Sequence, residues 1–159
     1  MNVKIICVGK LKEQYLRDAC GEYLKRLSRF ANVTVTELQE YRLTDNPSPA
    51  QLQKAVSEES MSILREIDRS DYVFALDVGA NQLTSEDFSR KIRSVSEDVR
   101  GCIVFIIGGS NGFSDDVRTR ADMRLGFSQM TFPHQLFRVM LLEQIYRAYK
   151  IAAGEKYHK

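Results

Sequence analysis

The last six residues of the chain combine side chains that can bind and modify nucleic acid. Tyr157 can stack on a nucleobase, and Lys156 and Lys159 can contact phosphate groups. His158 carries an imidazole, which can accept or donate a proton near neutral pH. Chain termini are often frayed, so these residue types alone leave a functional tail and an unstructured tail both open.

A glycine-rich segment is the second candidate. Residues 108–112 (GGSNG) follow the apolar run 102–107 (CIVFII) directly. Glycine lets the backbone approach a ligand closely. The segment lacks the GxGxxG pattern of dinucleotide sites and the Lys-Ser or Lys-Thr of a phosphate-binding loop. Contact with a ligand and a plain tight turn are both compatible with it.

The third candidate is the segment 127–134 (FSQMTFPH), in which large apolar side chains alternate with hydroxyl and amide groups. Such a loop can enclose an adenine between apolar side chains while backbone groups bind its edge. The alternative is a strand end that enters a helix at Pro133. His134 is the second histidine of the chain, and it could be structural or catalytic.

Strands and helices are expected to alternate along the chain. Apolar or β-branched runs predict strands at 3–8, 33–38, 72–78, 102–107 and 123–128. Apolar residues at three- and four-residue steps predict helices over 13–30 and 50–67, one capped by Thr84, a short one from Ser114, and one over 133–153. This order predicts an α/β fold with a mostly parallel sheet and helices on both faces. Ligands bind such sheets beyond the carboxyl ends of the strands. Residues 76–81, 108–112 and 127–132 each lie at or just beyond the carboxyl end of a predicted strand, so we expect a ligand site there.

Length and composition narrow the class of protein. A chain of 159 residues favours one domain, 1–159, and the loop 41–49 is too short for a domain boundary. We expect a cytoplasmic protein, since the chain has neither an apolar run of membrane-spanning length nor the pattern of a secretory signal. Three cysteines are expected to be buried free thiols, and two histidines without a CxxC or HExxH pattern argue against a metal site.

The charge and the last helix both suggest partners. Residues 1–116 carry a net charge of −3, whereas residues 117–159 carry +5. A basic segment can meet RNA, although a solvated charged helix has the same composition. The first half of the helix 133–153 is apolar on most sides, which indicates either a partner subunit or a central core helix.

Taken together, several segments resemble one family. The opening VKIICVGKLKEQY, the GGSNG segment, the block SQMTFPHQLFRVMLLEQIYRA and the closing YHK are similar to the RlmH family of SPOUT-class methyltransferases. The resemblance covers the whole chain. It implies S-adenosylmethionine as cofactor, and methylation of N3 of a pseudouridine in 23S ribosomal RNA on assembled ribosomes.

The resemblance also implies structural features and residue roles. It implies a homodimer without a separate RNA-binding domain, and a C-terminal trefoil knot over approximately 71–153. The cofactor contacts that it implies are Leu76, Gly108, Phe127, Ser128, Gln129, Met130, Thr131 and Phe132. His158 is the preferred proton acceptor with His134 second, while Tyr157 and Lys159 orient the base. Some relatives carry Arg at the position of Lys159, and Arg differs from Lys in its planar fork of donors.

Two other functions remain open at this point. A SPOUT enzyme could act on transfer RNA instead. A cofactor-binding RNA-binding protein or ribosome assembly factor could have the same sites without turnover.

Overall fold

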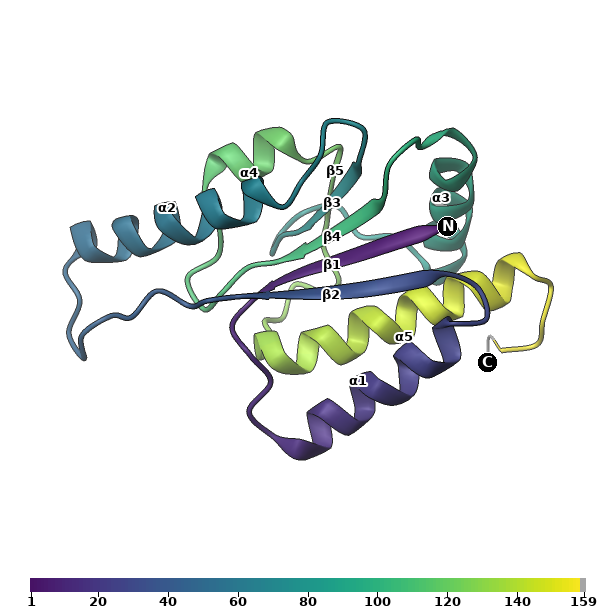
Figure 1. Ribbon diagram of the computed structural model, residues 1–159, viewed down its shortest axis with the longest axis horizontal. Helices are drawn as coiled ribbons and strands as arrows, with labels where there is room; N and C mark the ends of the chain where they lie inside the picture. Colours follow the sequence, from purple (N-terminus) through teal and green to yellow (C-terminus); the bar gives the residue numbers. More distant parts are fainter. Residues whose placement is uncertain (158–159) are drawn as a thin grey trace.

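Five strands and five helices alternate along residues 1–157, the part of the chain that the computed structural model describes (Figure 1). The strands are β1 (Asn2–Val8), β2 (Asn32–Leu38), β3 (Tyr72–Leu76), β4 (Ile103–Ile107) and β5 (Met123–Leu125). The helices are α1 (Gln14–Leu27), α2 (Pro49–Arg65), α3 (Ser85–Asp98), α4 (Asp115–Arg120) and α5 (His134–Ala152).

The strands form one sheet in the order β2-β1-β4-β3-β5, and every pair in it is parallel. The most apolar run of the sequence, β4, is buried along its whole length between β1 and β3. The predicted α/β class and parallel sheet are therefore confirmed. All carboxyl ends point to one edge of this sheet, which we call the carboxyl edge, and all amino ends to the opposite, amino edge.

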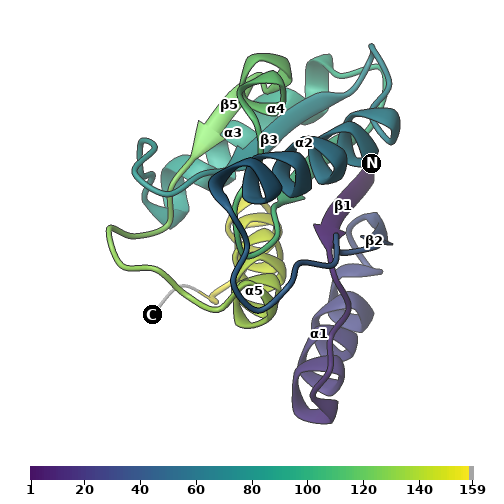
Figure 2. The same cartoon turned by 90° about the vertical axis from the view of Figure 1, so that its left-hand side faces the viewer.

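Helices cover both faces of the sheet, as the alternating pattern predicts. α1, α3 and α5 pack on one face, and α2 and α4 on the other (Figures 1 and 2). Successive residues of β4 alternate between the two cores: Phe105 packs with α1, α3 and α5, and Ile106 with α2 and α4. The helix cap at Thr84 is also confirmed, because its hydroxyl accepts the Asp87 N–H at 3.1 Å.

Several boundaries differ from the sequence prediction, and the following three bear on the site or its scaffold. β3 ends at Leu76 instead of residue 78, because the chain turns at once, with the Ala80 N–H donating to the Asp77 carbonyl. β5 ends at Leu125 instead of residue 128, where the chain enters a loop. α1 ends at Leu27, three residues before the predicted end.

Two single residues also differ from prediction. Pro133 has an extended backbone and caps α5 instead of forming its first helical residue, so the helix begins at His134. Cys102 precedes β4 and is partly exposed, whereas Cys7 and Cys20 are buried free thiols as expected.

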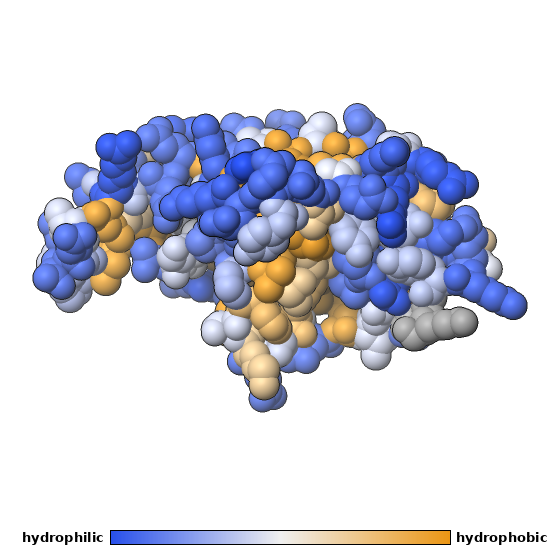
Figure 3. Space-filling view, turned by 90° about the horizontal axis from the view of Figure 1, so that it is seen from below, coloured by the Kyte–Doolittle hydropathy of each residue, from blue (hydrophilic) through white to orange (hydrophobic). Residues whose placement is uncertain are grey.

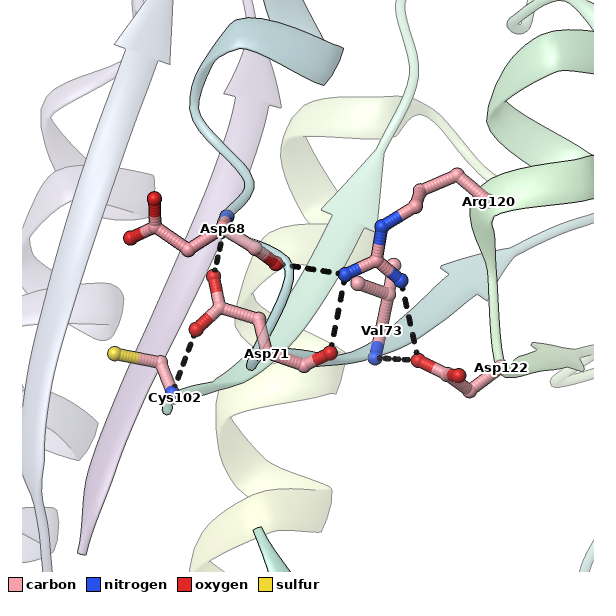
Figure 4. Close-up of polar contacts among 6 residues, drawn as sticks. All are labelled: Asp68, Asp71, Val73, Cys102, Arg120 and Asp122. Atoms are coloured by element: carbon pink, nitrogen blue, oxygen red, sulfur yellow. Dashed lines mark hydrogen bonds and ion pairs between the residues drawn. The ribbon is translucent and has the colours of Figure 1, made fainter. Parts of the chain in front are cut away.

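At the amino edge, one buried carboxylate holds the segments before β3 and β4 together. Asp71 accepts the Asp68 N–H at 2.9 Å and the Cys102 N–H at 2.7 Å (Figure 4). Backbone N–H groups at strand ends lack sheet partners, so a side chain that accepts two of them replaces the missing ladder.

Hydrogen bonds also connect the chain after α4 with the segment before β3. The Arg120 guanidinium donates to the carbonyls of Asp68 and Asp71 at 2.8 and 3.1 Å, and it pairs with Asp122 at 3.3 Å (Figure 4). Asp122 accepts the Val73 N–H at 2.8 Å. These bonds fix the start of β5 beside β3 and thereby set where the chain leaves the opposite edge.

Candidate cofactor and substrate site

A cavity of about 400 Å³ lies at the carboxyl edge, where the segments after β3, β4 and β5 meet. The three segments that sequence analysis placed there do converge. The residues that line the cavity are Leu76, Asp77, Val78, Ile107, Gly108, Gly109, Ser110, Gly112, Phe113, Leu125, Phe127, Ser128, Met130, Thr131, Phe132, Pro133, His134 and Phe137.

Most of the expected cofactor contacts line this cavity. They are Leu76, Gly108, Phe127, Ser128, Met130, Thr131 and Phe132. Gln129 lies on the same loop but is exposed and is not among the lining residues. His134 also lines the cavity, from the first turn of α5.

The loop between β5 and α5 is shaped by a close approach and by aromatic packing. The Gly126 N–H donates to the Asn81 carbonyl at 3.0 Å, and a Cβ on Gly126 would lie 2.4 Å from the Ala80 carbonyl oxygen. Only glycine fits so near another backbone. Beyond it, the Phe127 ring packs on Phe137 with centroids 4.8 Å apart, which turns the loop back over the start of α5.

Helix α2 forms the back wall of the glycine-rich loop with two neighbouring buried polar residues. The Ser60 hydroxyl accepts the Ser114 N–H at 2.8 Å. The Glu59 carboxylate accepts the Tyr41 N–H at 3.0 Å, and burial raises the pKa of this carboxyl. Sequence analysis missed both residues. The sequence did offer one signal for Glu59. It stands four residues before the buried Ile63, and residues at this spacing lie on the same face of a helix.

Asp77 is a second residue that sequence analysis missed. It lines the cavity directly after Leu76, and its carboxylate binds the Arg118 Nε at 2.9 Å. The hydrogen bond to Asp77 is the main cause that raises the pKa of Arg118. The wall of the cavity at this point therefore carries a carboxylate whose charge is balanced from α4.

Tyr157, at the end of the described part of the chain, packs against α5 away from the cavity. The Tyr157 ring packs on Tyr146 with centroids 5.0 Å apart, and the Arg147 guanidinium lies 4.8 Å from its centroid. Burial is the first cause that raises the pKa of Tyr157. Tyr146 follows His134 by twelve residues, roughly 18 Å along the helix axis. His158 and Lys159 lie outside the described residues.

Over residues 1–157, we find no cluster of three or more His, Cys, Asp or Glu side chains that could hold a metal ion. None of the helices in this part of the chain has both the length and the apolar character that crossing a membrane requires.

Comparison with known proteins defines the class. A family model described as predicted SPOUT methyltransferase matches residues 1–158. The fold resembles that of a probable methylase family protein from Haemophilus influenzae, with a TM-score of 0.56. At 8% identity, over 99% of this chain and 70% of the other, that likeness concerns the fold alone.

Closer relatives identify the family within that class. Ribosomal RNA large subunit methyltransferase H of Clostridium beijerinckii is 50% identical, and that of Carboxydothermus hydrogenoformans is 47% identical. A putative protein of the same name from Methanococcus maripaludis is 43% identical. Each match covers the whole of both chains. The chain therefore belongs to the RlmH family of SPOUT methyltransferases, which implies the C-terminal trefoil knot.

The cavity fits S-adenosylmethionine, the cofactor of this class. Its volume lies within the roughly 300–1,000 Å³ of ligand sites. Phe127, Phe132 and Leu76 provide apolar surface for an adenine ring, and the glycine-rich loop brings backbone groups close. Among residues 1–157, the lining contains the carboxylate of Asp77 and no Lys or Arg, which suits a ligand that carries a positive sulfonium.

Proposed function

We propose that this protein methylates N3 of a pseudouridine in 23S ribosomal RNA, with S-adenosylmethionine as the methyl donor. The observation that carries the proposal is the convergence of the three carboxyl-edge segments into one ligand-sized cavity. Two of those segments, GGSNG and SQMTFPH, are also those on which the family resemblance rests. The proposed knotted region, approximately 71–153, contains all three segments.

The lining of the cavity supports our assignment of the cofactor contacts. We assign them to Leu76, Gly108 and the loop residues Phe127, Ser128, Gln129, Met130, Thr131 and Phe132. Gln129 is assigned by its place in the loop, where its backbone can contribute even though its side chain is exposed. Apolar side chains exclude water from the reacting groups, and positioning is the largest catalytic contribution that such a site can make.

When bound, S-adenosylmethionine supplies an electrophilic methyl group. For N3 to take up this group, its proton would have to be accepted by a residue of the protein. We assign His158 as the group that accepts this proton, with His134 in the cavity wall as the second candidate. Tyr157 and Lys159 are assigned to orient the base and its backbone.

A second copy of the chain completes this site in our proposal. Apolar side chains gather in the middle of the face formed by α5 and the loop before it (Figure 3). Met130 is 75% exposed and Leu136 is 40% exposed there, and Phe132 is exposed beside them. Exposed apolar patches of this kind mark interaction sites. Since Tyr157 packs far from the cavity of its own chain, a homodimer provides a route by which the tail of one copy reaches the cavity of the other.

The test is transfer of an isotopically labelled methyl group to ribosomes isolated from a strain that lacks this gene. We expect label in 23S RNA as N3-methylpseudouridine by nucleoside mass spectrometry, and none in bulk transfer RNA. Label in transfer RNA would assign the enzyme to that substrate. Tight cofactor binding without any labelled nucleoside would indicate an assembly factor without turnover.

The residue roles are tested in the same assay. His158→Ala is expected to lower turnover by roughly 10²–10⁴-fold while cofactor affinity stays within about twofold. Unchanged turnover would remove His158 from the mechanism and leave His134 as the candidate. For the dimer, Leu136→Asp is expected to give a monomer in analytical ultracentrifugation, because a carboxylate would be buried in an apolar contact.

A further inference from the structure

The glycine-rich loop has a buried charge directly behind it. Glu59 is 5% exposed, although its side chain is ionisable. A Cβ on Gly109 would lie 3.1 Å from Glu59 Oε1, 3.5 Å from Glu59 Oε2 and 3.2 Å from Val8 Cγ1. The carboxylate therefore packs against the Gly109 backbone on one side, while Gly109 lines the cofactor cavity on the other.

Glu59 also borders a second cavity of about 710 Å³, which lies beside the first and shares Ser110 with it. The charged side chains that line this second cavity with Glu59 are Lys10, Glu37, Glu40 and Arg42. Glu37 is paired with the buried Arg138 at 2.6 Å. Glu59 itself accepts a hydrogen bond from the Tyr41 backbone N–H, a neutral donor.

The carboxylate at position 59 lowers stability in a way that an amide would avoid. Burial, and then the nearby Glu40, raise the pKa of Glu59, while the bond from Tyr41 lowers it. A Gln at this position could accept the same bond from Tyr41 through its side-chain oxygen without burying a charge. The fold therefore does not require a charge at position 59. Buried ionisable side chains with a shifted pKa are concentrated at functional sites.

The two ligands of a methyltransferase cavity differ in charge at a single atom. S-adenosylmethionine carries a positive sulfonium, whereas the product S-adenosylhomocysteine has a neutral sulfur. In the described part of the chain, no Lys or Arg lines the cavity, and the carboxylate that lines it, Asp77, is paired with Arg118. Glu59 forms no ion pair within the described residues, and its 5% exposed carboxylate thus places a negative charge next to this cavity.

We propose that Glu59 is a positioning residue that acts through the Gly109 backbone and makes the cavity prefer the cationic methyl donor over its neutral product. The inference rests on the proposed function, because it assumes that these two molecules are the ligands. It assigns to α2 a part in cofactor exchange: the attraction is present before methyl transfer and is lost once the sulfur becomes neutral.

The test compares the affinities of the two ligands in Glu59→Gln and in a matched control. Glu58→Gln changes the neighbouring residue on the same helix, whose side chain is exposed. Isothermal titration at about pH 8 gives the dissociation constants of both ligands for each variant and for the wild type. We expect the ratio of product to donor dissociation constants to fall roughly fivefold in Glu59→Gln and to stay unchanged in Glu58→Gln.

Two results would overturn the inference. If Glu59→Gln weakens both ligands by the same factor, the residue only supports the loop. If it leaves both affinities unchanged, the charge does not reach the cavity. A failure of the proposed function is distinguishable from either, because it appears as wild-type protein that binds the donor but leaves 23S RNA unmethylated.

A second measurement needs no variant. Because burial raises the pKa of Glu59 above its ordinary value, titration from about pH 8 toward acid should protonate this carboxylate and weaken the donor preference of the wild type. The same titration in Glu59→Gln should change the ratio less than in the wild type. A wild-type ratio that does not change in this titration, or that changes equally in the variant, contradicts the inference.

Discussion

The two edges of the sheet differ in the state of their side chains and backbone groups. Backbone groups at the amino edge have hydrogen-bond partners, whereas apolar side chains at the carboxyl edge are exposed to solvent. At the amino edge, Asp71, Asp122 and Arg120 bind the free backbone groups of the segments before β3 and β4. At the carboxyl edge, apolar side chains such as Met130 and Val78 are 75% and 67% exposed around a cavity. The difference indicates that one edge stabilises the fold and that the other is left open for ligands.

The largest effect is expected from Asp71→Ala at the amino edge. The substitution leaves the N–H groups of Asp68 and Cys102 without an acceptor, which we expect to lower the free energy of unfolding by about 3 kcal/mol. Thermal and urea denaturation measure this. Asp68→Ala is the control, because Asp68 contributes its backbone to the network. A loss of cofactor affinity in Asp71→Ala under folded conditions would contradict the separation of the two edges.

An intermediate effect is expected from Gly126→Ala at the carboxyl edge. The new Cβ would meet the Ala80 carbonyl oxygen, so the loop that follows must shift. We expect the dissociation constant for S-adenosylmethionine to rise roughly 30-fold, equivalent to about 2 kcal/mol. Gly21→Ala on α1, where a Cβ meets nothing within 4 Å, should leave binding unchanged. Equal affinities in the two variants would argue against this loop as the cofactor site.

The smallest effect on stability is expected from Met130→Ser, since the side chain is exposed in the single chain. The free energy of unfolding should change by less than about 0.5 kcal/mol. The Michaelis constants for S-adenosylmethionine and for ribosomes should nevertheless each rise by roughly threefold, because Met130 lines the cofactor cavity and its exposed side chain belongs to a surface that meets the substrate or a second copy. A stability loss above about 1 kcal/mol would show that Met130 serves the fold instead.

The sequence predicts the scaffold well because apolar periodicity reports burial. The strand order along the chain, both helix layers and the converging segments follow from runs such as 102–107 and from their place in a parallel sheet. It predicts strand ends less well. The ends at Leu76 and Leu125 depend on contacts between these segments, including the bond from Asp77 N–H to the Leu125 carbonyl at 3.0 Å, which no local pattern encodes.

The polar part of the site is the least predictable. Glu59 and Asp77 acquire their significance from packing against Gly109 and pairing with Arg118, residues that are distant in sequence. Their own neighbours along the chain are those of an ordinary surface helix and a strand end. The tail stands out in the sequence by its residue types and by the closing YHK of the family resemblance, and Tyr157, the described residue of that motif, packs on α5 away from the cavity.

Hydrogen exchange measured with and without S-adenosylmethionine tests the contrast between the edges most directly. The account predicts that the cofactor slows exchange in residues 76–78, 108–113 and 126–133, and that it leaves residues 68–73 and 120–122 unchanged. Slower exchange confined to the amino edge, or no change in the three carboxyl-edge segments at saturating cofactor, would contradict it.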